Sequence, residues 1–391
     1  MNHESKLKFL TKVSPKIPLI VSSIIFSSVT QAGSAGPVKI GGTEIKISGY
    51  IKADVIASDV DSSAGGRFSF ANQLVAPGFI PLEGSPGSNE DDLTLHARQS
   101  RLIVSAKSGD FNVKLEGDFF GAAGNERTSN SNNFRVRVAW AQYGNWGFGQ
   151  NWSAATIFPS FADQLNFSGF AGGYSAIRQT GIRYTNQGLV LALENPETTV
   201  SSVEPGPTSV LQGTDSYPDL IARYGTKGSY GAIQGALLIR GLSDTTGDLT
   251  DTGIGAIIGG TLKLGAKDDL KFLLGKGSVG RILGDSVYAD AEIVDGNLEA
   301  LDVTSAQIAY RHFWSSGVRS TVLYSAAEAD NDDSYAGSIL NKKTSTVMAN
   351  LLWDLSPKTT MGIEFSKTER EIESGAKGEL NRIQFSMQQK F

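Results

Sequence analysis

The stretch that decides the fold is the last one in the chain, Leu380–Phe391, which reads LNRIQFSMQQKF. In an extended strand, successive side chains point to opposite faces. One face then carries Ile383, Phe385, Met387 and Phe391, and the other carries Arg382, Gln384, Ser386, Gln388 and Lys390. Strands of about 10 residues with one apolar and one polar face are typical of transmembrane β-barrels. A half-buried strand of a soluble β-sandwich alternates in the same way, so the rest of the chain must distinguish the two.

The composition leaves few ways for this chain to cross a membrane. The 391 residues include 45 Gly and no Cys, and 40% of them are hydrophobic. No window offers the roughly 18 consecutive apolar residues of a membrane helix, so a membrane-spanning chain would have to close its strands into a barrel. The absence of cysteine excludes disulfides and thiolate chemistry. The formal net charge of −5 gives no indication of nucleic-acid binding.

The amino-terminal segment has the features of a secretory signal peptide. Four lysines between positions 6 and 16 precede the apolar run Ile17–Val29, and small residues follow around Ala32 and Ala35. The run is too short to remain as a membrane anchor. We predict that residues 1–32 are cleaved (1–35 if cleavage follows Ala35), that residues 33–44 form a short arm, and that residues 45–391 form the barrel. The protein is therefore expected to leave the cytoplasm.

Alternating strands recur along the chain, joined in turn by tight turns and long loops. The strand Phe134–Tyr143, for example, turns at Gly144–Asn145 into Trp146–Trp152. The alternation in Leu93–Ala106 breaks near Ser100, which indicates a bulge. Bacterial outer-membrane barrels have short periplasmic turns and long extracellular loops. We therefore predict an all-β fold: an antiparallel transmembrane β-barrel of about sixteen strands in the outer membrane of a Gram-negative bacterium.

The segment between Trp152 and Arg178 is long and shows no sustained alternation. A loop of this length can fold into a wide barrel and narrow it. We predict an inward-folded constriction loop with Phe161, Asp163 and Asn166 at the narrowing. The alternative is an ordinary external loop.

The polar faces of the strands carry the candidate functional residues. When the apolar faces are turned to lipid, basic side chains outnumber acidic ones on the inner wall, although the whole chain is net acidic. A ring of cations in a narrow channel attracts anions, and the planar guanidinium group binds carboxylates with two parallel hydrogen bonds. We predict a passive, anion-preferring channel. The residues expected to line it are Arg98, Arg101, Arg135, Arg137, Arg183, Arg223, Arg311 and Arg382. The alternative is that these arginines only pair with carboxylates of the wall.

Other motifs carry less weight. Gly275, Gly277 and Gly280 spell GxGxxG, but the helix and βαβ unit of a dinucleotide site do not follow. His96 and His312 would be needed in a phospholipase-like barrel enzyme, yet no nucleophile-elbow pattern surrounds any serine. A barrel that binds or adheres to surfaces through its loops is a further alternative. We predict no catalytic residues, no metal site and no cofactor.

Several short motifs resemble one known family. They are DFFG at Asp118–Gly121, GQNWS at Gly149–Ser153, RQTGIRYT at Arg178–Thr185, ALENPET at Ala192–Thr198 and AYRHFW at Ala309–Trp314. In these residues the chain resembles the DcaP-like outer-membrane porins. The resemblance implies a sixteen-stranded barrel, a homotrimer and an arginine-lined path for small anionic solutes, above all dicarboxylates. Outer-membrane lipid and lipopolysaccharide, and the barrel-assembly machinery that would recognise the strand ending in Phe391, are the other expected partners; nucleic acid is not.

Overall fold

The computed structural model of the protein describes residues 36–61, 77–83, 92–121, 130, 132–170, 172–173, 177–202, 209–283 and 287–391. The predicted signal peptide, whether it ends at residue 32 or 35, lies outside the described residues. No helix in the described ranges has the length and apolar character needed to cross a membrane.

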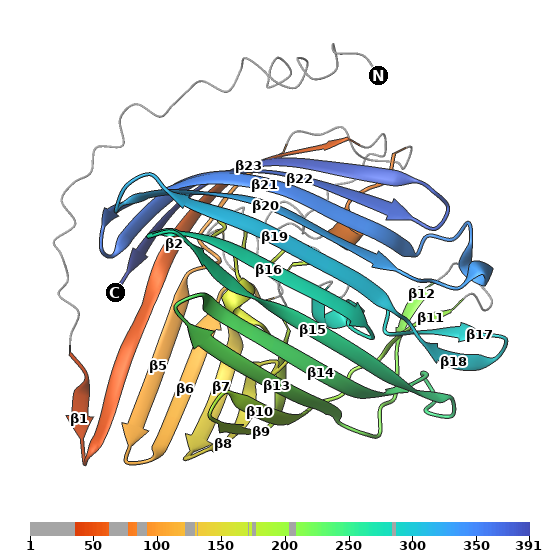
Figure 1. The fold of residues 1–391 in the computed structure, drawn as a ribbon, viewed down its shortest axis with the longest axis horizontal. Helices are drawn as coiled ribbons and strands as arrows, with labels where there is room; N and C mark the ends of the chain where they lie inside the picture. Colours follow the sequence, from red (N-terminus) through yellow and green to blue (C-terminus); the bar gives the residue numbers. More distant parts are fainter. Residues whose placement is uncertain are drawn as a thin grey trace, which may run out of the picture. The chain divides into compact units, whose positions relative to one another are not determined.

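Sixteen strands of the described chain form one closed antiparallel barrel, which confirms the predicted fold class. Each strand pairs with the next one along the chain, and β23 closes the barrel by pairing with β2 from Tyr50↔Lys390 to Asp61↔Glu379 (Figure 1). The barrel strands are β2 (Thr43–Asp61), β5 (Arg101–Ser108), β6 (Phe111–Asp118), β7 (Arg135–Tyr143), β8 (Trp146–Trp152), β9 (Arg178–Asn186), β10 (Leu189–Glu194), β13 (Asp219–Gly228), β14 (Gly231–Ser243), β15 (Thr250–Leu264), β16 (Asp268–Gly277), β19 (Val303–Phe313), β20 (Val318–Ala329), β21 (Asn341–Ser356), β22 (Thr359–Ile372) and β23 (Lys377–Lys390).

The expected irregularity near Ser100 is an interruption of one wall strand. The first part of β2, Glu44–Tyr50, pairs with β5. The later part, Asp54–Ser58, pairs with the short strand β4 (Asp92–His96). Residues 97–100 connect β4 to β5, and the backbone N–H of Ser100 donates to the carbonyl of Ala97. The break changes the alternation, so Arg98 and Arg101 both face inward.

The two faces of the barrel differ in polarity as the last strand predicts. On β23, Arg382, Gln384 and Ser386 are buried at 3%, 2% and 1% exposure, whereas Phe385 between them is partly exposed. Elsewhere on the outer face large apolar side chains are exposed, for example Leu237, Ile254 and Val322. A protein in water rarely exposes so continuous an apolar surface. The apolar face is therefore the lipid-facing one.

Tight turns join the strands at one end of the barrel. Gly144 and Gly188 in two of these turns have positive φ angles of 54° and 90°, a conformation that glycine adopts without steric cost. The other connections are longer, and two of them together build a small four-stranded sheet that is separate from the barrel sheet. Its strands are β11 (Thr199–Ser202), β12 (Ser209–Gln212), β17 (Ala291–Val294) and β18 (Asn297–Ala300).

The remaining described elements are short. They are β1 (Val38–Ile40), which pairs with the start of β2, the single-turn helix α2 (Gly280–Leu283), and the 3-10 turns η1 (Pro77–Phe79), η2 (Phe158–Ser160) and η3 (Asp333–Tyr335). Of these, α2 and η2 lie in the long connections that enter the barrel.

One side of the inner wall is apolar, which the alternation argument missed. Val190, Ile221, Leu238, Ile257 and Leu273 on β10 and β13–β16 belong to a buried cluster. The same cluster includes Ile157 next to η2, and Ile282 and Leu283 of α2. Two loop segments thus fill the interior against this part of the wall. A strand that is apolar on both faces gives no alternating pattern, so the sequence could not reveal this packing.

Candidate functional site

The loop between β8 and β9 lies inside the barrel, as the sequence analysis expects. Near its start, the backbone N–H of Ala154 donates to the carboxylate of Glu194 on β10 at 2.6 Å. Further along, the carbonyl of Ser160 accepts from the side chain of Gln307 on β19 at 2.9 Å. At its far point, the N–H groups of Leu165 and Asn166 donate to the Glu364 carboxylate of β22 at 2.7 and 3.0 Å. These attachment points on separate strands mean that the loop runs along the inside of the wall.

The three residues expected at the narrowing lie on this loop inside the barrel. The ring of Phe161 lies 5.9 Å from that of Trp152 and 5.3 Å from that of Phe158. Asp163 makes ion pairs with the wall, and the side-chain amide of Asn166 donates to the carbonyl of Ser168 at 2.6 Å. Asn166 is therefore a residue that shapes the loop.

The wall strands β5–β7 carry a cluster of arginines around two carboxylates. Arg137 Nε donates to Glu116 at 3.0 Å, and its Nη1 donates to Asp118 at 2.8 Å. Arg135 Nε donates to the same Asp118 at 2.8 Å, and Arg101 Nη1 lies 3.2 Å from Glu116. Cross-strand spacing brings these side chains together, because Asp118 and Arg135 are direct partners between β6 and β7.

Aromatic rings from the inner loop region cover this cluster. The guanidinium carbon of Arg137 lies 5.5 Å from the ring centre of Trp152 and 5.4 Å from that of Phe167. Arg135 lies 5.4 Å from the same Phe167 ring, and Arg178 lies 5.2 Å from Trp152. Cations within about 6 Å of a ring face are attracted to it. The rings hold the guanidinium planes in fixed orientations.

Arg183 and Arg223 continue the basic surface along the wall. Arg183 Nη2 donates to the carbonyl of Trp152 at 2.6 Å and lies 3.3 Å from Glu194. Arg223 Nη1 donates to the carbonyl of Thr156. Both arginines therefore also anchor the start of the inner loop.

On the opposite strands, Arg311 and Arg319 meet the loop at Asp163. A single carboxylate oxygen, Asp163 Oδ2, accepts from Arg311 Nη1 at 2.9 Å and from Arg319 Nε at 2.8 Å. Each arginine also pairs with a carboxylate of the wall, Asp269 for Arg311 and Asp354 for Arg319. Arg319 is absent from the set of lining residues predicted from the sequence, although its strand position places it on the inner wall.

The last two predicted lining residues are deeply buried. Arg98 is 6% and Arg382 is 3% exposed. Arg382 Nε donates to Ser58 on β2 at 3.2 Å. All eight predicted arginines thus lie on the inner side of the wall, but they differ greatly in access to the interior.

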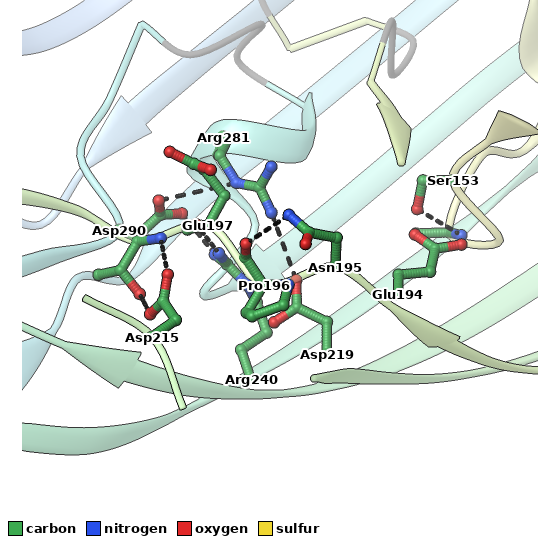
Figure 2. A network of polar contacts seen from close by, with 12 residues as sticks. Ser153, Glu194, Asn195, Pro196, Glu197, Asp215, Asp219, Arg240, Arg281 and Asp290 are labelled. Carbon is green, nitrogen blue, oxygen red and sulfur yellow. Dashed lines mark hydrogen bonds and ion pairs between the residues drawn. The ribbon is translucent and has the colours of Figure 1, made fainter. Parts of the chain in front are cut away.

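A second charged cluster, which the sequence analysis missed, lies where α2 and β17 meet β13 and β14 (Figure 2). The fully buried Arg240 donates to Asp219 at 3.3 Å and to Asp290, and its Nη2 donates to the carbonyl of Glu197. Arg281 Nη2 lies 3.3 Å from Asp219. Buried charges are tolerated when each is paired and hydrogen-bonded in this way. Arg281 and Asp290 come from a long connection without periodicity, so nothing in the sequence pointed to them. The cluster joins the small four-stranded sheet to the wall, because the Asp290 carboxylate also accepts from the backbone N–H of Thr199 on β11 at 2.9 Å.

The two histidines of the described chain have separate surroundings. His96 Nδ1 lies 3.7 Å from the Asp54 carboxylate in the buried interior. His312 Nδ1 lies 2.8 Å from Asp268, beside the rings of Tyr310 and Trp314 near the turn end of the barrel. Aromatic residues at that level are typical of a membrane interface.

A closed antiparallel barrel with an apolar outer band, a polar inner wall and an inward-folded loop defines the class: an outer-membrane channel of the porin type. The chain belongs to the family described as DcaP outer membrane protein, whose model matches residues 22–391. No curated protein matches the sequence.

Solved structures agree on the fold. The outer membrane channel DcaP of Acinetobacter baumannii superposes with a TM-score of 0.76 at 20% identity, covering 91% of this chain and 100% of that one. The anion-selective porin from Comamonas acidovorans gives 0.55 at 13% identity, covering 89% and 100%. OmpF of Salmonella typhi gives 0.53 at 11% identity, covering 90% and 99%. At these identities the likeness establishes the fold.

Proposed function

We propose that the protein is a passive channel that prefers small anions, with dicarboxylates as the favoured class. The observation that carries this proposal is the layering of charge on the inner wall. In several ion pairs the carboxylate is buried and the cation is the more exposed partner. Side-chain exposures are 34% for Arg135 against 0% for Asp118, and 22% for Arg311 against 7% for Asp269.

The same order holds elsewhere on the wall. Lys114 is 44% exposed and Arg101 17%, whereas their shared partner Glu116 is 4% exposed. Arg183 is 15% exposed against 4% for Glu194. At these pairs a solute in the interior meets the cation first, with the compensating carboxylate set back behind it. The resulting field favours anions in the channel.

Carboxylates suit this surface better than spherical anions do. The guanidinium group offers parallel N–H donors that match the two carboxylate oxygens. The wall carboxylates and stacked rings hold several guanidinium groups in place, so little entropy is lost when a solute binds. The porin from Comamonas acidovorans, which shares the fold, is described as anion-selective.

The direct test is the reversal potential of the purified protein in a planar bilayer under a KCl gradient. We expect the sign that corresponds to anion preference, and stepwise blockade of single channels when succinate is added. Butyrate, a monoanion of the same carbon number, should block less. Cation preference would refute the proposal.

Assembly and partners complete the proposed function. We expect a homotrimer in the outer membrane, to be tested by light scattering in detergent with the detergent contribution subtracted. The terminal Phe391 is 43% exposed, and its N–H donates to the carbonyl of Gly49. Its position fits recognition by the barrel-assembly machinery, and deletion of Phe391 should lower the amount of folded protein in the outer membrane.

A further inference from the structure

Asp163 holds an unusual position in the loop. It is the only charged residue between Trp152 and Arg178. Its Oδ2 atom accepts from Arg311 Nη1 at 2.9 Å and from Arg319 Nε at 2.8 Å. One carboxylate of the loop thus occupies a position between two guanidinium groups, where a carboxylate of a solute could form the same charge-assisted hydrogen bonds.

The two arginines do not depend on Asp163 for their orientation. Arg311 Nε donates to Asp269 Oδ2 at 3.0 Å, and Arg319 Nη1 donates to Asp354 Oδ2 at 2.9 Å. These wall carboxylates would keep both guanidinium groups in place when the Asp163 side chain swings away. The pair of arginines is therefore a preorganised carboxylate site.

The loop backbone is also fixed independently of the Asp163 side chain. The carbonyl of Asp163 accepts from the side-chain amide of Asn350 at 2.8 Å. The following residues, Leu165 and Asn166, are held by Glu364. A rotation of the Asp163 side chain would release the arginines without moving the loop.

The site is accessible from the barrel interior. Its charges balance only while Asp163 is paired with Arg311 and Arg319. The side chains of Arg311, Asp163 and Arg319 are 22%, 27% and 18% exposed. Lys271 on β16 adds a third cation to this part of the wall, 4.0 Å from Asp269. Three cations then face the carboxylates Asp163, Asp269 and Asp354. Undocking of Asp163 leaves a net positive site, which an incoming carboxylate neutralises.

We propose that Asp163 is an internal competitor for the carboxylate group of the solute. A solute carboxylate displaces Asp163 from Arg311 and Arg319, and Asp163 returns when the solute leaves. This inference rests on the proposed anion channel. An exchange of this kind keeps binding weak enough for release, which conduction requires.

The test is the succinate concentration that half-blocks the single channel. Asp163→Asn should lower it about tenfold, because the solute no longer has to displace a charged hydrogen-bond acceptor. Asp333→Asn, which removes the same charge from η3, is the matched control and should leave the value unchanged. If Asp163 only attaches the loop to the wall, Asp163→Asn would leave the half-blocking succinate concentration unchanged or raise it. Either result would overturn the inference.

A second variant separates charge from loop structure. The chain has no cysteine, so Asp163→Cys introduces a unique thiol. Modification with a sulfonatoethyl thiosulfonate restores a negative charge and should raise the half-blocking concentration again, whereas a trimethylammonium reagent should not. Equal effects of the two reagents would contradict the proposal. Cation preference of the wild-type channel would instead refute the proposed function itself, so the two failures are distinguishable.

Discussion

Arg135 donates from Nε to Asp118 Oδ1 at 2.8 Å, and the arginine is 34% exposed while the aspartate is fully buried. Asp118 is also held by Arg137, whose Nη1 lies 2.8 Å away. Removal of Arg135 therefore takes a cation from the interior surface without leaving the buried carboxylate unpaired. The relationship makes Arg135 the clearest position at which to test how the wall selects ions.

We predict that Arg135→Ala lowers the anion preference of the channel while the barrel still folds. Arg183→Ala should act in the same direction, and Arg135→Lys should largely keep the selectivity because it keeps the charge. Reversal potentials under a salt gradient measure all three. Lys343→Ala, on the 49% exposed side chain that pairs with Glu328, is the control. If both arginine variants kept the wild-type selectivity, the wrong side chains would have been chosen.

The strand pattern was predictable because lipid and water impose opposite polarities on neighbouring residues. The terminal strand from Leu380 onward was sufficient to assign its two faces, and the inward positions of Arg135, Arg183 and Arg311 follow from the same rule. The attachment of the inner loop was not predictable. Its contacts join residues far apart in sequence, such as Leu165 and Glu364, and no local pattern encodes them.

The charge balance of the wall was predictable only in part. The alternation rule counted side chains on strands and found an excess of bases. It could not count Asp163 or Asp290, because both come from connections without periodicity. The structure shows that these two carboxylates pair with wall arginines. The basic excess is therefore smaller than the strands alone indicate.

The Glu364 carboxylate should determine whether the inner loop stays attached to the wall. It accepts the backbone N–H groups of Leu165 and Asn166 and the side-chain amide of Asn350. Glu364→Gln keeps the shape but replaces one acceptor oxygen with a donor. We predict a loss of about 2 kcal/mol in loop attachment, seen as larger and noisier single-channel currents. Glu328→Gln, at a 53% exposed side chain, is the control and should leave the currents unchanged. If Glu364→Gln gave single-channel currents with wild-type size and noise, other contacts would be sufficient to hold the loop against the wall.

A close backbone approach holds the returning part of the loop against β20. Gly172 has a φ of 78°, and a Cβ atom built there would lie 2.0 Å from the carbonyl oxygen of Ala326. Gly172→Ala should therefore displace this part of the loop and lower stability by about 2 kcal/mol. Thermal unfolding in detergent measures the loss. Gly337→Ala is the matched control, because its φ is 82° but no atom lies within 4 Å of the added Cβ. Equal losses in the two variants would mean that backbone strain alone, and not the contact with Ala326, sets the effect.

The small four-stranded sheet should respond to pH through Glu292 on β17. Burial raises the pKa of this carboxyl group from 4.5 to about 7, and the nearby carboxylates of Asp332, Glu373 and Glu299 add to the effect. One of its oxygens accepts from the backbone N–H of Asp332 at 2.9 Å, which joins the sheet to the loop before η3. Because the folded state binds the proton more tightly than the unfolded state, the stabilising contribution is full below pH 4.5 and is lost as the pH rises through 7.

We therefore predict that the amides of β17 exchange faster at pH 8 than at pH 5, after correction for the intrinsic pH dependence of exchange. Hydrogen exchange followed by mass spectrometry on peptides that cover Ala291–Val294 measures this. Glu292→Gln imitates the neutral carboxyl group. In this variant the β17 amides should exchange slowly at both pH 5 and pH 8, so the difference between the two pH values should disappear. The amides of β7 in the barrel wall serve as the internal reference, since β7 pairs, among the described strands, only with β6 and β8 and lies away from this sheet. A pH effect that persists in Glu292→Gln would assign the response to Asp332, Glu373 or Glu299 instead.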